Sequence, residues 1–212
     1  EETGQDATLA IASDKNETLL VSYPALKTGT GYAAAHVQLE FGARATGEPH
    51  QTHPIACDIA DEIRNVEFPT ATPLVMTAER TFWEKATAMH VYCLQGRLRS
   101  ERYSRHWYDL AAIANSPYFA SALTDRILAR QVAEHKSAFF VEKDAQGEKI
   151  NYYLAVMGAT RLVPEGETFT ALERDYRAML EDGLLSGDQP DFATVMRMCR
   201  EIETRINDVD VK

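Results

Sequence analysis

Cysteine, long apolar runs and positive charge are all scarce in this sequence. Its three cysteines are odd in number and far apart, at Cys57, Cys93 and Cys199. They suggest neither a disulfide framework nor a paired-cysteine metal site, and they fit a reducing cytoplasm. No apolar run approaches the ~18 residues that cross a membrane, and no signal peptide is visible. We therefore expect a cytoplasmic protein without a membrane partner.

The shortage of positive charge limits the partners further. The chain has 22 lysines and arginines against 32 acidic residues, a formal net charge of −10. Binding nucleic acid by bulk electrostatics requires a basic face, so we expect no DNA binding by the chain itself. A local basic pocket inside an acidic body is still compatible with this balance. Lys85, Arg102 and Arg105 are the candidates for it.

A first block that mixes aromatic and basic residues is the run RTFWEK at residues 80–85. We predict a helix here, capped by Thr77 or Thr81, with Glu84 three residues after Thr81 as in a capping box. Apolar residues recur at helical spacing, namely Phe82, Ala86, Met89 and Cys93. Lys85 lies off this apolar stripe. Two interpretations follow: a solvated lysine on an amphipathic helix, or an ammonium that reaches a cleft.

The second block is RYSRHWYDL at residues 102–110. We predict that it starts a helix that runs to Asn115 and ends at the following Ser-Pro. Arg105, His106 and Asp109 then share a face, because residues three and four apart are neighbours on a helix. They form either an ordinary Arg105–Asp109 pair or an electropositive cluster, oriented by one acid, that holds phosphate oxygens.

The residues before these blocks are strand-like. Short β-prone runs occupy 8–12 and 18–23, and in 33–44 apolar side chains alternate with His36, Gln38 and Glu40. We predict a loop at 47–54, a strand or helix at 55–66, and a last strand at 73–76. Zinc binding by His36, His50 and His53 is conceivable, but no fourth ligand has recognisable spacing.

The residues after the second block are mostly helical in pattern. We predict helices at 120–136, 169–181 and 191–207, the second stopped by Gly183 and the third capped by Asp191. Strands at 139–141 and 150–154 are an open question. Sheet followed by helices indicates an α+β fold with a boundary near Met76.

The two central blocks together resemble the nucleotidyltransferase toxins of the AbiEii/AbiGii family, whose superfamily also contains polymerase β. The C-terminal pattern agrees, with RLVP at 161–164, DYRAM at 175–179 and Ile206-Asn207 in the same order. The resemblance covers about Leu19 to Asn207. It implies the toxin of a bacterial type IV abortive-infection toxin–antitoxin pair, with a cognate antitoxin as partner. It also implies part of a mixed β-sheet domain at 1–76 and a helical domain at 77–212.

The resemblance further implies transfer of a nucleotidyl group from an NTP to an acceptor, with RNA, particularly a tRNA 3′ end, expected. Three carboxylates of the family hold Mg²⁺ with the substrate phosphates, and Glu40 is the candidate for the third. Lys85 and Arg105 would contact the triphosphate, with Arg102 and His106 as further candidates. Asp109 would either orient Arg105 or act as a base toward the acceptor hydroxyl.

One feature of the family is missing. A Gly-Gly or Gly-Ser turn followed by Asp-x-Asp or Asp-x-Glu does not occur early in this chain. We therefore expect a fragment that lacks this segment and is catalytically incomplete alone. The alternative is a non-catalytic module that binds an antitoxin or an RNA.

Overall fold

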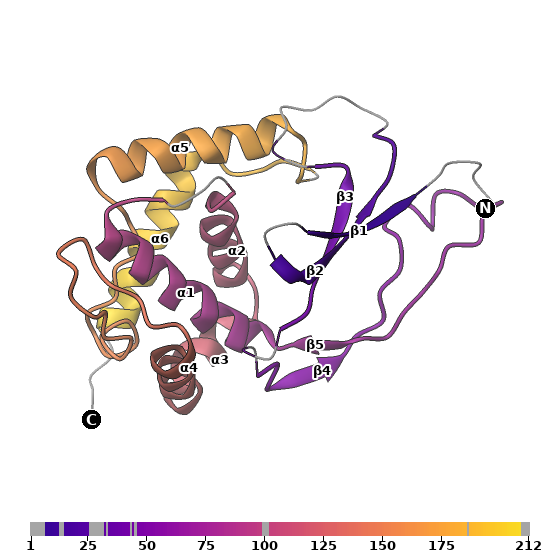
Figure 1. Ribbon diagram of the computed structural model, residues 1–212. Helices are drawn as coiled ribbons and strands as arrows, with labels where there is room; N and C mark the ends of the chain where they lie inside the picture. Colours follow the sequence, from indigo (N-terminus) through magenta and orange to yellow (C-terminus); the bar gives the residue numbers. More distant parts are fainter. Residues whose placement is uncertain are drawn as a thin grey trace.

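A computed structural model gives the arrangement of the chain. It describes residues 7–12, 15–25, 32, 34–42, 44, 46–98, 102–185 and 187–208. The strands come first in the sequence and the helices follow, and the two kinds of element gather on opposite sides of the molecule (Figure 1). The α+β prediction is confirmed. Among the described residues, no helix is long and apolar enough to cross a membrane.

The strands form two small antiparallel sheets. The first has the order β1-β2-β3, and the second pairs β4 with β5. Their bounds are β1 Thr8–Ala12, β2 Lys15–Ser22, β3 His36–Glu40, β4 His50–Thr52 and β5 Leu74–Met76. All of these pairings are antiparallel, so the described strands show no parallel pair of the kind that a mixed sheet contains.

The register of the first sheet explains the alternation seen in the sequence. Val21 pairs with Leu9 on one side and Val37 on the other, so these three apolar side chains share a face. Gln38 and Glu40 belong to the opposite face. The apolar face is open to solvent, since Leu9 is 69% and Val37 is 51% exposed.

Two predictions for residues 47–66 are wrong. The predicted loop at 47–54 contains β4, whose three residues pair with β5. The predicted strand or helix at 55–66 consists of turns, with an isolated bridge between Ile55 and Ala71. The predicted boundary between two domains falls between the end of β5 at Met76 and the cap of the first helix at Thr77. The division into domains itself stays a prediction.

Helices make up the second half of the chain. Their bounds are α1 Ala78–Gln95, α2 Ser104–Ala114, α3 Tyr118–Thr124, α4 Arg126–Phe139, α5 Gly166–Glu181 and α6 Phe192–Asn207. Asp191 caps α6 and Gly183, with φ 65°, follows the end of α5, as expected. The segments 139–141 and 150–154 are not strands.

Asp125 divides the single helix predicted at 120–136. Its backbone, with φ −79° and ψ 76°, leaves the helical region and ends α3. Its carboxylate then accepts the N–H of Leu128 at 2.9 Å and caps α4. Aspartate competes for backbone donors in this way more often at caps than inside helices. The break turns the chain and gives α4 its own direction.

The core lies around α1. Phe82, Ala86 and Met89 of the predicted apolar stripe are fully buried and Cys93 is half-buried, so the stripe faces inward, and Trp83 beside it is fully buried too. Burying each large side chain contributes roughly 1.5–3 kcal/mol. The polar ends of the tryptophans are also satisfied: Trp83 Nε1 donates to Ala122 O at 3.0 Å, and Trp107 Nε1 to Leu162 O at 2.6 Å. These bonds fix α1 and α2 relative to the rest of the helical part.

Candidate active site around Lys85

Lys85 on α1 meets two side chains of α2. Its Nζ lies 2.7 Å from Asp109 Oδ2 and 3.2 Å from His106 Nδ1. The Lys85 side chain is 23% exposed and that of Asp109 is 39% exposed. Lys85 is therefore not a freely solvated lysine. The structure brings together three of the residues that the sequence singled out, from two different helices.

The contacts define the protonation of His106. An ammonium can only donate, so His106 Nδ1 accepts and the ring proton belongs on Nε2. Burial, together with the charges of Lys85, Arg105 and Lys136, lowers the pKa of His106 to about 3. The imidazole is therefore neutral near pH 7. The cluster is a cation held by one carboxylate and one neutral acceptor.

A cavity of about 300 Å³ opens beside this cluster. Its walls come from α1, from α2, from the end of α4 and from the segment after α4. The lining residues are Glu84, Lys85, Ala88, Val91, Tyr92, His106, Lys136, Phe140, Glu142 and Tyr152. Five of these ten residues are apolar or aromatic and four are charged, so convergent polar groups lie within a partly apolar wall, as in small-molecule sites.

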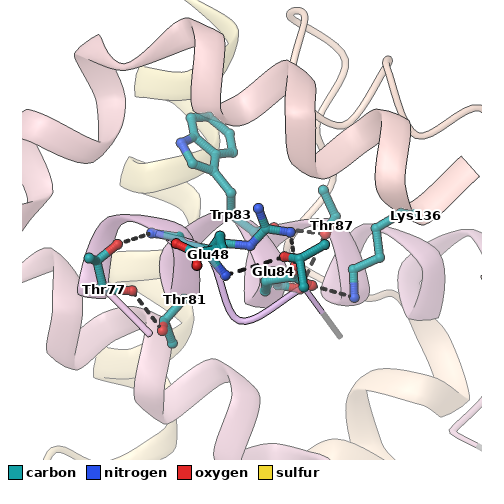
Figure 2. A network of polar contacts seen from close by, with 9 residues as sticks. Glu48, Thr77, Thr81, Trp83, Glu84, Thr87 and Lys136 are labelled. Carbon is teal, nitrogen blue, oxygen red and sulfur yellow. Dashed lines mark hydrogen bonds and ion pairs between the residues drawn. The ribbon is translucent and has the colours of Figure 1, made fainter. Parts of the chain in front are cut away.

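Glu84 connects the cavity to α4. Its carboxylate accepts from Arg80 Nη2 at 3.0 Å and pairs with Lys136 Nζ at 2.6 Å. Glu84 and Lys136 face each other in Figure 2, where the Thr77 hydroxyl also accepts the backbone N–H of Arg80 in the first turn of α1. Thr77 is therefore the cap of α1. The predicted capping box is wrong, because Glu84 forms ion pairs instead.

The beginning of α2 is held from a distant helix. No side chain at the N-cap of α2 accepts a backbone N–H. Instead, Asp175 on α5 accepts the N–H of Arg102 at 2.6 Å and that of Ser104 at 2.7 Å. Asp175 is only 9% exposed. This carboxylate thus does the work of a helix cap and sets the position from which His106 and Asp109 project.

The other predicted site residues lie elsewhere. Arg105 is exposed on α2, does not line the cavity, and does not pair with Asp109 among the described ion pairs. Arg102 has a left-handed φ of 71°, and its guanidinium lies 5.7 Å from the centre of the Tyr32 ring. Glu40 is exposed on β3 and accepts a hydrogen bond from Gln38. Phosphate binding by Arg102 and Arg105 stays a prediction.

The metal predictions receive no support from side-chain clustering. Within the described ranges, no three histidine, cysteine, aspartate or glutamate side chains gather closely enough to hold a metal ion. Glu40 does not line the cavity beside Lys85. Mg²⁺ binding by Glu40 therefore stays a prediction. The same holds for zinc at His36, His50 and His53.

Sequence reasoning missed Lys136, the partners of Glu84, and Asp175. Lys136 had no distinguishing signal, since a lysine near a helix end is usually solvated. Asp175 had a weak one: it lies three residues after Leu172 and four before Met179, both fully buried, so it falls on the inward face of its helix. A carboxylate on such a face needs a partner.

One comparison with known proteins finds a match that covers most of the chain. The family model described as "Nucleotidyl transferase AbiEii toxin, Type IV TA system" matches residues 1–198. No curated protein and no solved structure matches the chain. The match includes all of the residues that line the cavity, from Glu84 to Tyr152. The chain therefore belongs to the AbiEii family of nucleotidyl transferase toxins of type IV toxin–antitoxin systems.

Proposed function

We propose that the cavity beside Lys85 binds the triphosphate of an NTP, and that the protein transfers the nucleotidyl group to an RNA acceptor such as a tRNA 3′ end. The observation that carries this proposal is the Lys85 ammonium, held at 2.7 Å from Asp109 and 3.2 Å from His106 at the cavity wall. Such chemistry depends largely on positioning and on neutralising the charge of the phosphates.

Lys85 suits phosphate binding because Asp109 and His106 both hold its ammonium in place. Two of its three N–H donors are directed to Asp109 and His106, and the third is left for a phosphate oxygen. In this scheme Asp109 orients Lys85 and does not orient Arg105. Because His106 is neutral, it accepts a hydrogen bond from Lys85 without repelling the ammonium. It also carries no negative charge that would repel a phosphate.

The reaction would exchange one bond for another at the α-phosphorus. The acceptor hydroxyl oxygen bonds to the α-phosphorus as its proton passes to water, and the bond from the α-phosphorus to the bridging oxygen breaks, releasing pyrophosphate. Lys85 would stabilise the negative charge on the phosphate oxygens as this happens. The antitoxin of the system would be the protein partner.

The test is transfer of label from each α-³²P-NTP to total RNA by the product of the complete gene. We expect transfer with the wild-type protein and none with Lys85→Ala. Lys149→Ala is the matched control, since Lys149 is exposed and does not line the cavity. Transfer that survives in Lys85→Ala at the wild-type rate would contradict the proposal.

A further inference from the structure

A second lysine reaches the same cavity from a different helix. Lys136, near the end of α4, lines the cavity together with Lys85. Its side chain is 14% exposed, so most of it is buried. Lysines are rarely buried to this extent unless their ammonium is paired. Here the partner is Glu84, 2.6 Å away.

The pair with Glu84 uses only one of the three N–H donors of the Lys136 ammonium. Glu84 also accepts from Arg80, whose side chain is 5% exposed, so one carboxylate serves two cations. The Lys136 ammonium lies 4.5 Å from the centre of the Phe140 ring, which accounts for a second direction around its nitrogen. A third N–H remains for an acceptor in the cavity.

The other two charged residues of the lining also have polar partners. Glu142, the other acidic residue in the lining, accepts a hydrogen bond from Gln95 at 3.0 Å. Lys85 is held by Asp109. Two separate ammonium groups therefore lie at one cavity, each positioned by its own carboxylate. Lys136 is near enough to His106 to contribute to lowering its pKa.

We propose that Lys136 is a second phosphate-binding residue of this site and that it contacts a different phosphate of the chain from the one bound by Lys85. This inference rests on the proposed function, because it assumes that the triphosphate enters this cavity. Glu84 is then a positioning residue, which holds Lys136 at the cavity wall. Two cations from different helices at one cavity favour a polyphosphate over a single phosphate, since a polyphosphate carries more negative charge and offers an oxygen to each.

The competing explanation is a purely structural ion pair between α1 and α4. In that case, Glu84→Gln should weaken tripolyphosphate binding at least as much as Lys136→Gln, because it breaks this pair and also the pair of Glu84 with Arg80. If Lys136 contacts phosphate, loss of its ammonium should weaken binding more than loss of the Glu84 carboxylate that positions it. Lys136→Gln and Glu84→Gln therefore separate the two explanations.

The experiment is calorimetric titration of the purified protein with sodium tripolyphosphate and, separately, with orthophosphate. The variants are Lys136→Gln, Lys136→Met and Glu84→Gln, with Lys149→Gln as the exposed control and Lys85→Gln as the reference for the site. Both Lys136 variants keep much of the aliphatic stem that packs at Phe140. Melting temperatures measured in parallel report the structural contribution of the pair.

We expect both Lys136 variants to bind tripolyphosphate about tenfold more weakly than the wild type, the scale of one charge-assisted hydrogen bond. Glu84→Gln should bind more tightly than either Lys136 variant, and Lys149→Gln should bind like the wild type. The preference for tripolyphosphate over orthophosphate should shrink when Lys136 is lost.

Unchanged tripolyphosphate binding in the Lys136 variants, with binding lost in Lys85→Gln, would overturn this inference and leave the proposed function standing. Equal loss of affinity in Glu84→Gln and Lys136→Gln would overturn it too, because the ion pair alone would then explain the effect. Unchanged binding in Lys85→Gln would count against the proposed function itself.

Discussion

The carboxylate of Asp175 accepts the backbone N–H of Ser104 at 2.7 Å, although the two residues are 71 positions apart. It also accepts the N–H of Arg102. A helix normally obtains such a partner from its own N-cap side chain. Here α5 supplies the partner to α2, so the helix that carries His106 and Asp109 depends on a residue far along the chain.

Removing this carboxylate should therefore destabilise the protein. We expect Asp175→Ala to lower the free energy of unfolding by about 1–3 kcal/mol, because the buried N–H of Ser104 and the partly buried N–H of Arg102 lose their acceptor. Urea unfolding followed by circular dichroism measures this. Glu173→Ala on the same helix is the control, since its side chain is 45% exposed. Equal effects of the two changes would contradict a special role for Asp175.

Changes at Lys85 should separate activity from stability. Its pair with Asp109 is partly exposed, and such pairs contribute about 0–1 kcal/mol. We expect Lys85→Ala and Asp109→Ala in the complete gene product to abolish growth inhibition while the free energy of unfolding changes by no more than ~1 kcal/mol. Growth curves and urea titrations measure the two effects. Unfolding at growth temperature would instead indicate a structural role.

The buried imidazole of His106 predicts a dependence of stability on pH. Its pKa is lowered to about 3 in the folded protein, against an ordinary value near 6.5. Between these values the unfolded state binds a proton that the folded state does not, so stability falls as the pH falls below about 6.5. One such group changes the free energy of unfolding by up to about 1.4 kcal/mol per pH unit.

His90 also makes stability fall as the pH falls, since burial lowers its pKa to about 4. We therefore expect His106→Gln to reduce the slope of stability against pH between pH 4 and 6 without removing it. Thermal melts across this range measure the slope. The control is His53→Gln, because His53 is exposed. A slope that does not change in His106→Gln would show that the imidazole is not buried as described.

The cap between α3 and α4 predicts a specific loss of stability. We expect Asp125→Ala to lower the free energy of unfolding by about 0.5–2 kcal/mol, because the N–H of Leu128 loses its acceptor. Asp125→Asn should retain most of the stability, since asparagine caps helices nearly as well. Denaturation with urea compares the three proteins. An equal loss in both variants would point to the charge rather than to the cap.

The helices were largely predictable because their signals are local. The stripe of Phe82, Ala86 and Met89 and the cap at Asp191 depend on residues within a few positions of one another, and the structure contains both. The break at Asp125 was not predicted, because the apolar pattern continues through it. There, one carboxylate ends one helix and begins the next, which periodicity does not reveal.

The site was predictable only within each helix. Arg105 and Asp109 share a face of α2, but Asp109 pairs with Lys85, whose position depends on how α1 packs. The packing is set by contacts distant in sequence, such as those of Trp107 and Asp175. For the same reason, neither Lys136 nor its partner Glu84 was identifiable from spacing alone.

Asp125 fixes the first residue of α4, so the number of residues between Asp125 and Lys136 decides where the Lys136 ammonium lies. Each residue added to a helix rotates everything beyond it by about 100° and shifts it by about 1.5 Å. A single alanine inserted between Asp125 and Lys136 would carry the ammonium away from Glu84, even though no existing side chain had changed. Substitutions on the exposed face of α4 should be tolerated, whereas insertions and deletions there should not.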